Sequence, residues 1–176
     1  MRVVAGQYGG RRLVAPPGRD TRPTSDRVRE ALFSILGELE GARVLDLYAG
    51  SGAVGIEALS RGAASCEFVD SANAAITAIR RNLDTLGVVA PVHRRDAIQA
   101  LNDASKRGAA YDLVILDPPY RHPDGLGRAL SDALPPVLAP SGRVVSESDR
   151  RSPLELDMAL ADERRYGDTL IRIHDA

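Results

Sequence analysis

The chain has 176 residues, of which 44% are hydrophobic and 27% are charged, with a formal net charge of -1. This length predicts one domain with a packed core, and the composition argues against wholesale disorder. No apolar run is long enough to cross a membrane, and no stretch near the start is typical of a secretory signal. Because Cys66 is the only cysteine, an internal disulfide framework and a cysteine-rich zinc site are excluded. We therefore expect a cytoplasmic protein.

Residues 1–24 are basic, whereas the rest of the chain is mildly acidic. They hold five arginines, Arg2, Arg11, Arg12, Arg19 and Arg22, against one aspartate, a net charge of +4. Two short apolar strands around Gly9 and Gly10, followed by a Pro/Gly-rich connector, predict a small β-hairpin extension at 1–24 and a main domain at 25–176. Such a segment suits a phosphate-rich partner, and the alternative is a solvated surface segment.

The first helix is predicted to begin after Thr24 or Ser25, either of which can cap it, and to end at Gly37. Asp26 lies in its first turn, where the helix dipole favours a carboxylate. Apolar side chains then recur at helical spacing from Val28 to Leu36, so one face of this helix is buried.

From residue 43 onward, apolar runs typical of strands alternate with helical patterns. The strands are predicted at 43–48, 66–70, 91–96, 111–117 and 143–148, and the helices at 53–61, 72–86, 97–107 and about 124–134. This alternation predicts an α/β fold with a doubly wound, mostly parallel sheet. The segment RRYGDTLIRI adds two strands that turn at Gly167 and Asp168, so we expect seven strands with an antiparallel final hairpin.

Four predicted strands end in or near an aspartate: Asp46, Asp70, Asp96 and Asp117. Ligands of open parallel sheets bind at the carboxyl ends of the strands, so these carboxylates should line one crevice. A lone aspartate at such a position is more often a helix cap or turn residue. Four in register favour a ligand that carries several hydrogen-bond donors.

The turn after the first strand reads DLYAGSGAVG, and Asp70 follows Gly50 by 20 residues. This spacing is also typical of a dinucleotide-binding fingerprint. However, Asp46 would face the ligand and repel a pyrophosphate, and the chain leaves no room for a separate substrate domain. S-adenosylmethionine fits better: Asp46 and the glycine turn can hold its amino group, Asp70 its ribose and Asp96 its adenine amine.

The most specific signal is Asp117-Pro118-Pro119-Tyr120 at the end of the fourth strand. The prolines make this turn rigid, and the Asp117 carboxylate and the Pro118 carbonyl can both accept hydrogen bonds from one exocyclic amine. Tyr120 offers a face on which a flipped-out or single-stranded base can stack. The alternative is an ordinary Pro-Pro turn with a core tyrosine.

Together these motifs resemble a known family. DLYAGSG, Asp70 and DPPY resemble the class I S-adenosylmethionine-dependent methyltransferases that act on exocyclic amines. The N-terminal blocks RVVAGQYGGRRL and RPTSDRVREALFSIL resemble the RsmD family of bacterial 16S rRNA guanine-N2 methyltransferases. The resemblance runs from Arg2 to the terminal hairpin.

The resemblance implies a Rossmann-like methyltransferase fold, S-adenosylmethionine as cofactor with S-adenosylhomocysteine as product, and 16S rRNA as substrate, free or within an assembling or assembled small ribosomal subunit. We expect a monomer, because nothing in the sequence suggests an exposed self-association surface. It assigns the cofactor to Asp46, Ala49, Gly50, Gly52, Asp70, Asp96 and Ala97, with Thr24 and Arg27 near its carboxylate or a phosphate. It assigns the target guanine to Asp117, Pro118, Pro119 and Tyr120, and the RNA backbone to Arg2, Arg11, Arg12 and Arg22.

Two alternatives stay open. A DNA amino-methyltransferase shares the DPPY chemistry but normally needs a larger target-recognition region. A nicotinamide- or nucleotide-binding module would use the glycine turn alone. We expect no metal, because His93 and His174 lack a partner at metal-ligand spacing, and we expect Cys66 to be a buried strand residue.

Overall fold

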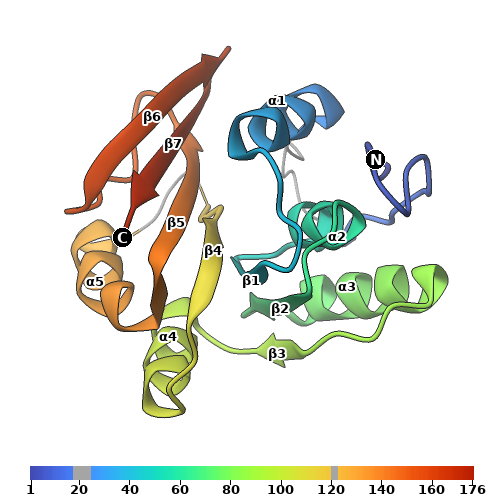
Figure 1. Cartoon of the computed structure of the whole chain (residues 1–176), viewed down its shortest axis with the longest axis horizontal. Helices are drawn as coiled ribbons and strands as arrows, with labels where there is room; N and C mark the ends of the chain where they lie inside the picture. The colour runs from blue at the N-terminus through green and yellow to red at the C-terminus, as the bar shows by residue number, and fades with distance from the viewer. Residues whose placement is uncertain (18–24, 120–122) are drawn as a thin grey trace.

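The computed structural model describes residues 1–17, 25–119 and 123–176 (Figure 1). Arg19, Arg22, Thr24 and Tyr120, which the sequence singled out, therefore lie outside the described residues. Within the described ranges no helix is both long and apolar enough to span a bilayer.

The described residues form one seven-stranded sheet with helices on both faces. The strands are β1 (Arg43–Leu47), β2 (Ser65–Asp70), β3 (Val92–Arg94), β4 (Tyr111–Leu116), β5 (Leu138–Asp149), β6 (Ala159–Tyr166) and β7 (Thr169–Asp175). The helices are α1 (Asp26–Leu36), α2 (Ala53–Ser60), α3 (Asn73–Leu86), α4 (Ala97–Lys106) and α5 (Leu126–Ala133), with a 3₁₀ turn η1 at Pro135–Val137.

The strand order is β3-β2-β1-β4-β5-β7-β6. Strands β1 to β5 pair in parallel, and β7 pairs antiparallel to both β5 and β6. The doubly wound sheet and its antiparallel final hairpin are confirmed. Since the chain moves outward from β1 to β3 and then returns to β4 on the other side of β1, the winding reverses between β1 and β4. Ligands of such sheets bind at this reversal.

Two apolar cores flank the sheet. Helices α1, α2 and α3 cover the face that carries Val44 and Ile115, whereas α4, α5 and η1 cover the face that carries Leu45 and Val114 (Figure 1). The central strand β4 is apolar on both faces, as its sequence predicts. Cys66 is buried in β2 as expected.

The ends of two elements follow their local sequence. Ser25 caps α1, since its Oγ accepts the Val28 N–H at 3.3 Å, and Gly37 ends the helix with a φ of 72°. Strand β5 begins at Leu138, five residues earlier than the apolar pattern indicates, because Leu138 already pairs with Tyr111.

The N-terminal segment folds back on itself as a short antiparallel hairpin, but its two sides are shorter than strands. Residues 1–17, called the arm below, contain an isolated antiparallel bridge between Arg2 and Arg12 instead of two strands. Across this hairpin the Val3 N–H bonds to the Arg11 carbonyl and the Leu13 N–H to the Met1 carbonyl, whereas other backbone groups of the arm bond to α2. The Val4 and Ala5 N–H groups bond to the Glu57 carboxylate, and the Tyr8 N–H bonds to Ser60 Oγ. The arm is therefore fastened to α2 and is not a free ribbon.

Candidate active site

The first part of the site is the glycine loop, defined as residues 48–52, which follows β1. Tyr48, Gly50 and Gly52 all have a positive φ, of 60°, 58° and 77°. A tyrosine rarely adopts this conformation, so the loop holds Tyr48 against a local conformational cost. The Ala49 N–H donates to the Val69 carbonyl at 3.0 Å, which fixes the loop to the end of β2.

The glycines of this region differ in what surrounds them. A Cβ at Gly55 would lie 2.5 Å from the Phe68 ring and 2.7 Å from Cys66 Sγ, so this glycine lets α2 pack against β2. A Cβ at Gly50 would meet only the Tyr48 carbonyl oxygen, at 3.9 Å. Gly50 therefore borders open space, where a ligand can approach the backbone closely.

Asp70 ends β2 beside the glycine loop, where the sequence places it. It is only 4% exposed. Its Oδ2 accepts the Gly50 N–H at 2.9 Å, and its Oδ1 accepts the Ala72 N–H at 2.8 Å, just before α3. Asp70 thus orders the loop and the start of α3 together.

Asp46 has a different environment from the expected one. Its position in β1 directs it to the face covered by α2, where it is 2% exposed and its Oδ2 accepts the Gly55 N–H at 3.0 Å. Burial raises the pKa of Asp46 to about 7; the Gly55 hydrogen bond opposes this shift and the Asp70 charge adds to it. Its carboxylate secures α2 under the loop, and contact with a cofactor stays a prediction.

Asp96 caps α4, which is the ordinary role of an aspartate at a strand end. Its Oδ1 accepts the N–H groups of Ile98 at 2.9 Å and Gln99 at 3.3 Å, and Ala97 behind it is buried. The pKa of Tyr48 is raised to about 12, mainly by burial and further by the negative charge of Asp96. Asp96 is therefore close enough to the glycine loop to act on it electrostatically.

Asp117 and its prolines follow β4 on the other side of the loop. Leu47 of β1 pairs with Val69 of β2 and with Leu116 of β4. The residues that follow these three are Tyr48, Asp70 and Asp117. They therefore lie side by side at the carboxyl ends of neighbouring strands. Asp117 is half-buried, Pro118 is buried and Pro119 is exposed. The structure thus brings the two motifs singled out by the sequence to one edge, at the winding reversal.

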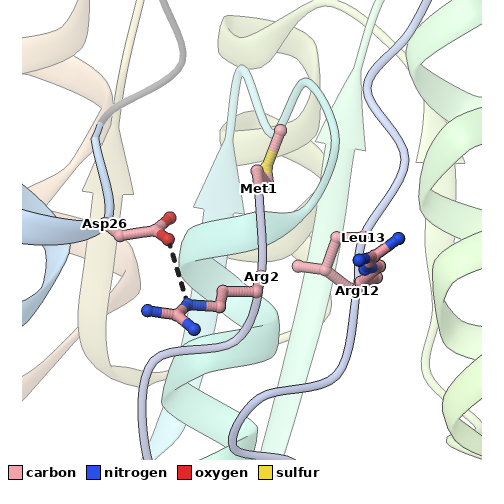
Figure 2. Close-up of a pocket in the computed structure, with 5 residues that line it drawn as sticks. All are labelled: Met1, Arg2, Arg12, Leu13 and Asp26. Carbon is pink, nitrogen blue, oxygen red and sulfur yellow. Dashed lines mark ion pairs between the residues drawn. The ribbon is translucent and has the colours of Figure 1, made fainter.

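The described arginines predicted to meet RNA lie on the arm. The Arg2 Nε is 3.4 Å from Asp26 Oδ2, and the Arg11 guanidinium donates to the Thr85 carbonyl at 2.8 Å. Arg27 is exposed on α1. A cavity of about 420 Å³ lies between the arm and the start of α1 and is lined by Met1, Arg2, Arg12, Leu13 and Asp26. Figure 2 draws these residues, with the ion pair between Arg2 and Asp26 dashed.

Two buried polar residues escaped the sequence interpretation. Glu57 is fully buried on α2 and accepts two arm N–H groups, and Asn82 is 2% exposed on α3 and bonds to both the arm and the glycine loop. Each interrupts the apolar face of its predicted helix. That interruption was the available signal.

Strand order, the glycine loop after β1 and the Asp-Pro-Pro motif after β4 define the fold of the class I methyltransferases. The family described as Conserved hypothetical protein 95 matches residues 1–175. The chain belongs to this family, which is the RsmD family that its motifs resemble.

Relatives agree with this assignment. The chain is 41% identical to YlbH of Bacillus subtilis (strain 168), a candidate rRNA methyltransferase, over 99% of this chain and 98% of that protein. It is 39% identical to the ribosomal RNA small subunit methyltransferase D of Escherichia coli (strain K12), over 69% of this chain and 61% of that protein.

Solved structures show the same fold. The candidate methyltransferase yhhF from Escherichia coli superposes with a TM-score of 0.81 at 34% identity, covering 99% of this chain and 97% of that one. A hypothetical protein of Thermus thermophilus superposes with a TM-score of 0.86 at 26% identity, covering 100% of this chain and 99% of that one.

Proposed function

We propose that this chain transfers a methyl group from S-adenosylmethionine to the exocyclic N2 amine of a guanine in 16S rRNA of the small ribosomal subunit. The observation that carries the proposal is the placement of the glycine loop and of Asp117-Pro118-Pro119 at the ends of paired strands β1 and β4. The family match over residues 1–175 and the relatives named as rRNA methyltransferases support it.

The residues at the glycine loop fit this cofactor. Gly50 borders open space, and the nearby carboxylates of Asp70 and Asp96 suit a cationic ligand that lacks phosphate. A carboxylate has about four acceptor positions, so Asp70 can take ribose hydroxyls while it still accepts its two backbone N–H groups. When bound, S-adenosylmethionine supplies an electrophilic methyl group on a sulfonium centre.

Asp117 and Pro118 would hold the target amine. The Asp117 carboxylate and the Pro118 carbonyl each accept one N–H of the amine, which directs the nitrogen lone pair toward the glycine loop. The nitrogen–carbon bond would form as the sulfur–methyl bond breaks and S-adenosylhomocysteine is released, so positive charge passes to the nitrogen, where the Asp117 carboxylate stabilises it. The nitrogen then loses a proton to this carboxylate or to water, and no covalent bond to the enzyme is needed.

The arm would supply the RNA contacts. Arg2, Arg11 and Arg12 are exposed and lie on one segment, so they can neutralise backbone phosphates without reading sequence. In this proposal residues 1–24 are the RNA-binding extension, residues 25–176 form the catalytic domain, and the chain acts as a monomer.

The first test is transfer of labelled methyl from S-adenosylmethionine to small-subunit particles that lack the modification, with matched DNA as control. Label in N2-methylguanine of the 16S rRNA is the expected result. Label in DNA would keep the chemistry and overturn the substrate. No transfer, together with no cofactor binding by calorimetry, would return the chain to the nucleotide-module alternative.

Substitution of two aspartates separates chemistry from cofactor binding. Asp117→Ala should lower kcat by roughly 100- to 1000-fold, the usual effect of losing a group that stabilises transition-state charge. Asp70→Ala should act mainly on the cofactor, because it removes the acceptor that orders the loop. Asp112→Ala is the matched control, since Asp112 lies on the same strand but pairs with Arg43 away from the carboxyl edge. Equal, small effects of all three variants would contradict the site.

A further inference from the structure

Asn82 joins two segments that are remote in sequence. It lies in α3 with a side chain only 2% exposed. Its Oδ1 accepts the Val14 N–H at 2.8 Å, and its Nδ2 donates to the Val14 carbonyl at 3.0 Å and to the Ser51 carbonyl at 2.9 Å. One amide therefore ties the arm to the centre of the glycine loop.

The three hydrogen bonds of Asn82 connect α3 to the arm and to the glycine loop, and none of them lies within the helix. Neither Val14 nor Ser51 belongs to α3, and both amide donor positions and the acceptor of Asn82 are used. A buried amide is costly unless it is hydrogen-bonded, and here the partners that satisfy it all lie outside α3. The polar residue makes sense as a link between two backbone segments.

A second contact joins the same two segments. Ser51 Oγ lies 3.3 Å from Met1 Sδ, at the other end of the arm. Arg2 follows Met1, and Arg12 precedes Val14 by two residues. The two arginines that line the cavity of Figure 2 are therefore each within two residues of a contact to Ser51 or to Asn82. On the other side of the loop, Gly50 bonds to Asp70.

We propose that Asn82 is a positioning residue that couples the arm to the glycine loop, so that RNA bound to the arm and cofactor bound at the loop tighten each other. The inference rests on the proposed function and adds a regulatory link to it. RNA phosphates on Arg2 and Arg12 favour one placement of the arm, and Asn82 passes that placement to Ser51 and hence to Gly50. Thermodynamic linkage requires the effect to be reciprocal.

The test measures binding of S-adenosylhomocysteine, which cannot react, by calorimetry with and without a saturating 16S rRNA transcript. In the unaltered chain the transcript should tighten this binding by about 5-fold or more, the lower end of ordinary coupling. Asn82→Ala removes all three bonds, and Asn82→Asp keeps the acceptor for the Val14 N–H but places an oxygen against two carbonyls. In both variants the ratio of the affinities for S-adenosylhomocysteine with and without the transcript should be about 1, while each ligand still binds alone.

Val137→Ala is the control for lost stability, because Val137 is fully buried in the other core, among α4 and α5. It should keep the full ratio. If the Asn82 variants do not fold, exchange of the Val14 amide hydrogen in the unaltered chain replaces them, and S-adenosylhomocysteine should slow that exchange.

Three results would overturn the inference. The first is an affinity of the unaltered chain for S-adenosylhomocysteine that the transcript does not change. The second is the same tightening by the transcript in both Asn82 variants as in the unaltered chain. The third is an exchange rate of the Val14 amide hydrogen that S-adenosylhomocysteine does not alter. In each of these the proposed function stands as long as S-adenosylhomocysteine binds. Absence of any binding by the unaltered chain would instead overturn the proposed function itself.

Discussion

The arm and the C-terminal hairpin are both additions to the parallel sheet, but different interactions hold them. In the hairpin, β7 pairs with both β5 and β6 along antiparallel ladders, the second with one irregularity near Leu160, and its charged side chains form ion pairs such as Arg164–Asp162. The arm contains one isolated bridge and is fastened by buried polar side chains of α2 and α3. Figure 1 shows the two additions on opposite sides of α1.

This difference concentrates the stability of the arm in few atoms. A strand ladder spreads its bonds over many backbone groups, so one side chain changes little. Glu57 and Asn82 each hold several arm or loop groups at once, and the few backbone bonds within the arm do not replace these anchors to α2 and α3. Single substitutions should therefore act strongly on the arm and weakly on the hairpin.

The strongest expected effect is at Glu57. Glu57→Ala leaves the N–H groups of Val4 and Ala5 without their acceptor and removes the partner of Arg61 at 2.7 Å. Loss of one member of a buried pair costs roughly 3 to 5 kcal/mol. Denaturant unfolding measures the loss, and trypsin should cut the arm near Arg11 and Arg12 sooner. Glu57→Gln keeps one acceptor oxygen and should lose less. A change below about 1 kcal/mol in Glu57→Ala would contradict this view of the arm.

Asp46 is a buried carboxylate like that of Glu57, but it accepts one backbone N–H instead of two. Its pKa is raised from 3.8 to about 7, so between these values the folded chain binds a proton that the unfolded chain does not. Stability contributed by this group is present at low pH and is lost as the pH rises toward 7. Asp46→Asn removes this dependence, and relative to it the unaltered chain should lose about 3 kcal/mol from pH 5 to pH 8.

The measurement is the free energy of unfolding of both chains at several pH values from 5 to 8. If the two plots against pH run parallel, Asp46 stays ionised throughout, and the prediction is wrong. Because the amide can still accept the Gly55 N–H, the variant should fold, and its stability at pH 8 is the reference for the comparison.

Gly6 tests how closely the arm approaches α2. A Cβ at Gly6 would lie 1.8 Å from the Ser60 carbonyl oxygen, and its φ is +79°. Gly10 has nearly the same φ of +81° but nothing within 4 Å of such a Cβ. Gly10→Ala should therefore cost about 1 kcal/mol for the backbone alone, and Gly6→Ala about 2 to 3 kcal/mol. Thermal unfolding of both variants measures the difference, and equal costs would mean that the arm does not press on Ser60.

Much of the fold follows from the sequence because its periodicity is local. Alternating apolar runs and helical patterns place all seven strands and α1 to α5 to within about five residues, and Gly167-Asp168 marks the final turn. The arm folds back as the hairpin that its apolar pattern predicts, but with one isolated bridge where the pattern predicts two strands. The side chains that take its backbone bonds, Glu57 and Ser60, lie more than 50 residues further along.

The candidate site was predictable to the level of its motifs. Strand ends carry Asp70 and Asp117, and parallel pairing brings them to the two sides of the glycine loop. The direction of Asp46 was not predictable in the same way, since a residue inside a strand can face either layer. Asn82 lies between Ile79 and Leu83 on an apolar face, and only the packed structure shows that Val14 and Ser51 meet there.

The smallest expected effect is in the hairpin, at Arg164. Its guanidinium is 3.1 Å from Asp162, but its side chain is 55% exposed, so water and salt already screen the pair. Arg164→Gln should change the free energy of unfolding by less than about 0.5 kcal/mol. Arg61→Gln is the informative counterpart, because Arg61 pairs with fully buried Glu57 and lies 5.0 Å from the Phe33 ring centre. Denaturant unfolding should show a several-fold larger loss at Arg61. Equal losses would mean that exposed ladder pairs and buried anchors contribute alike, and the contrast between arm and hairpin would fail.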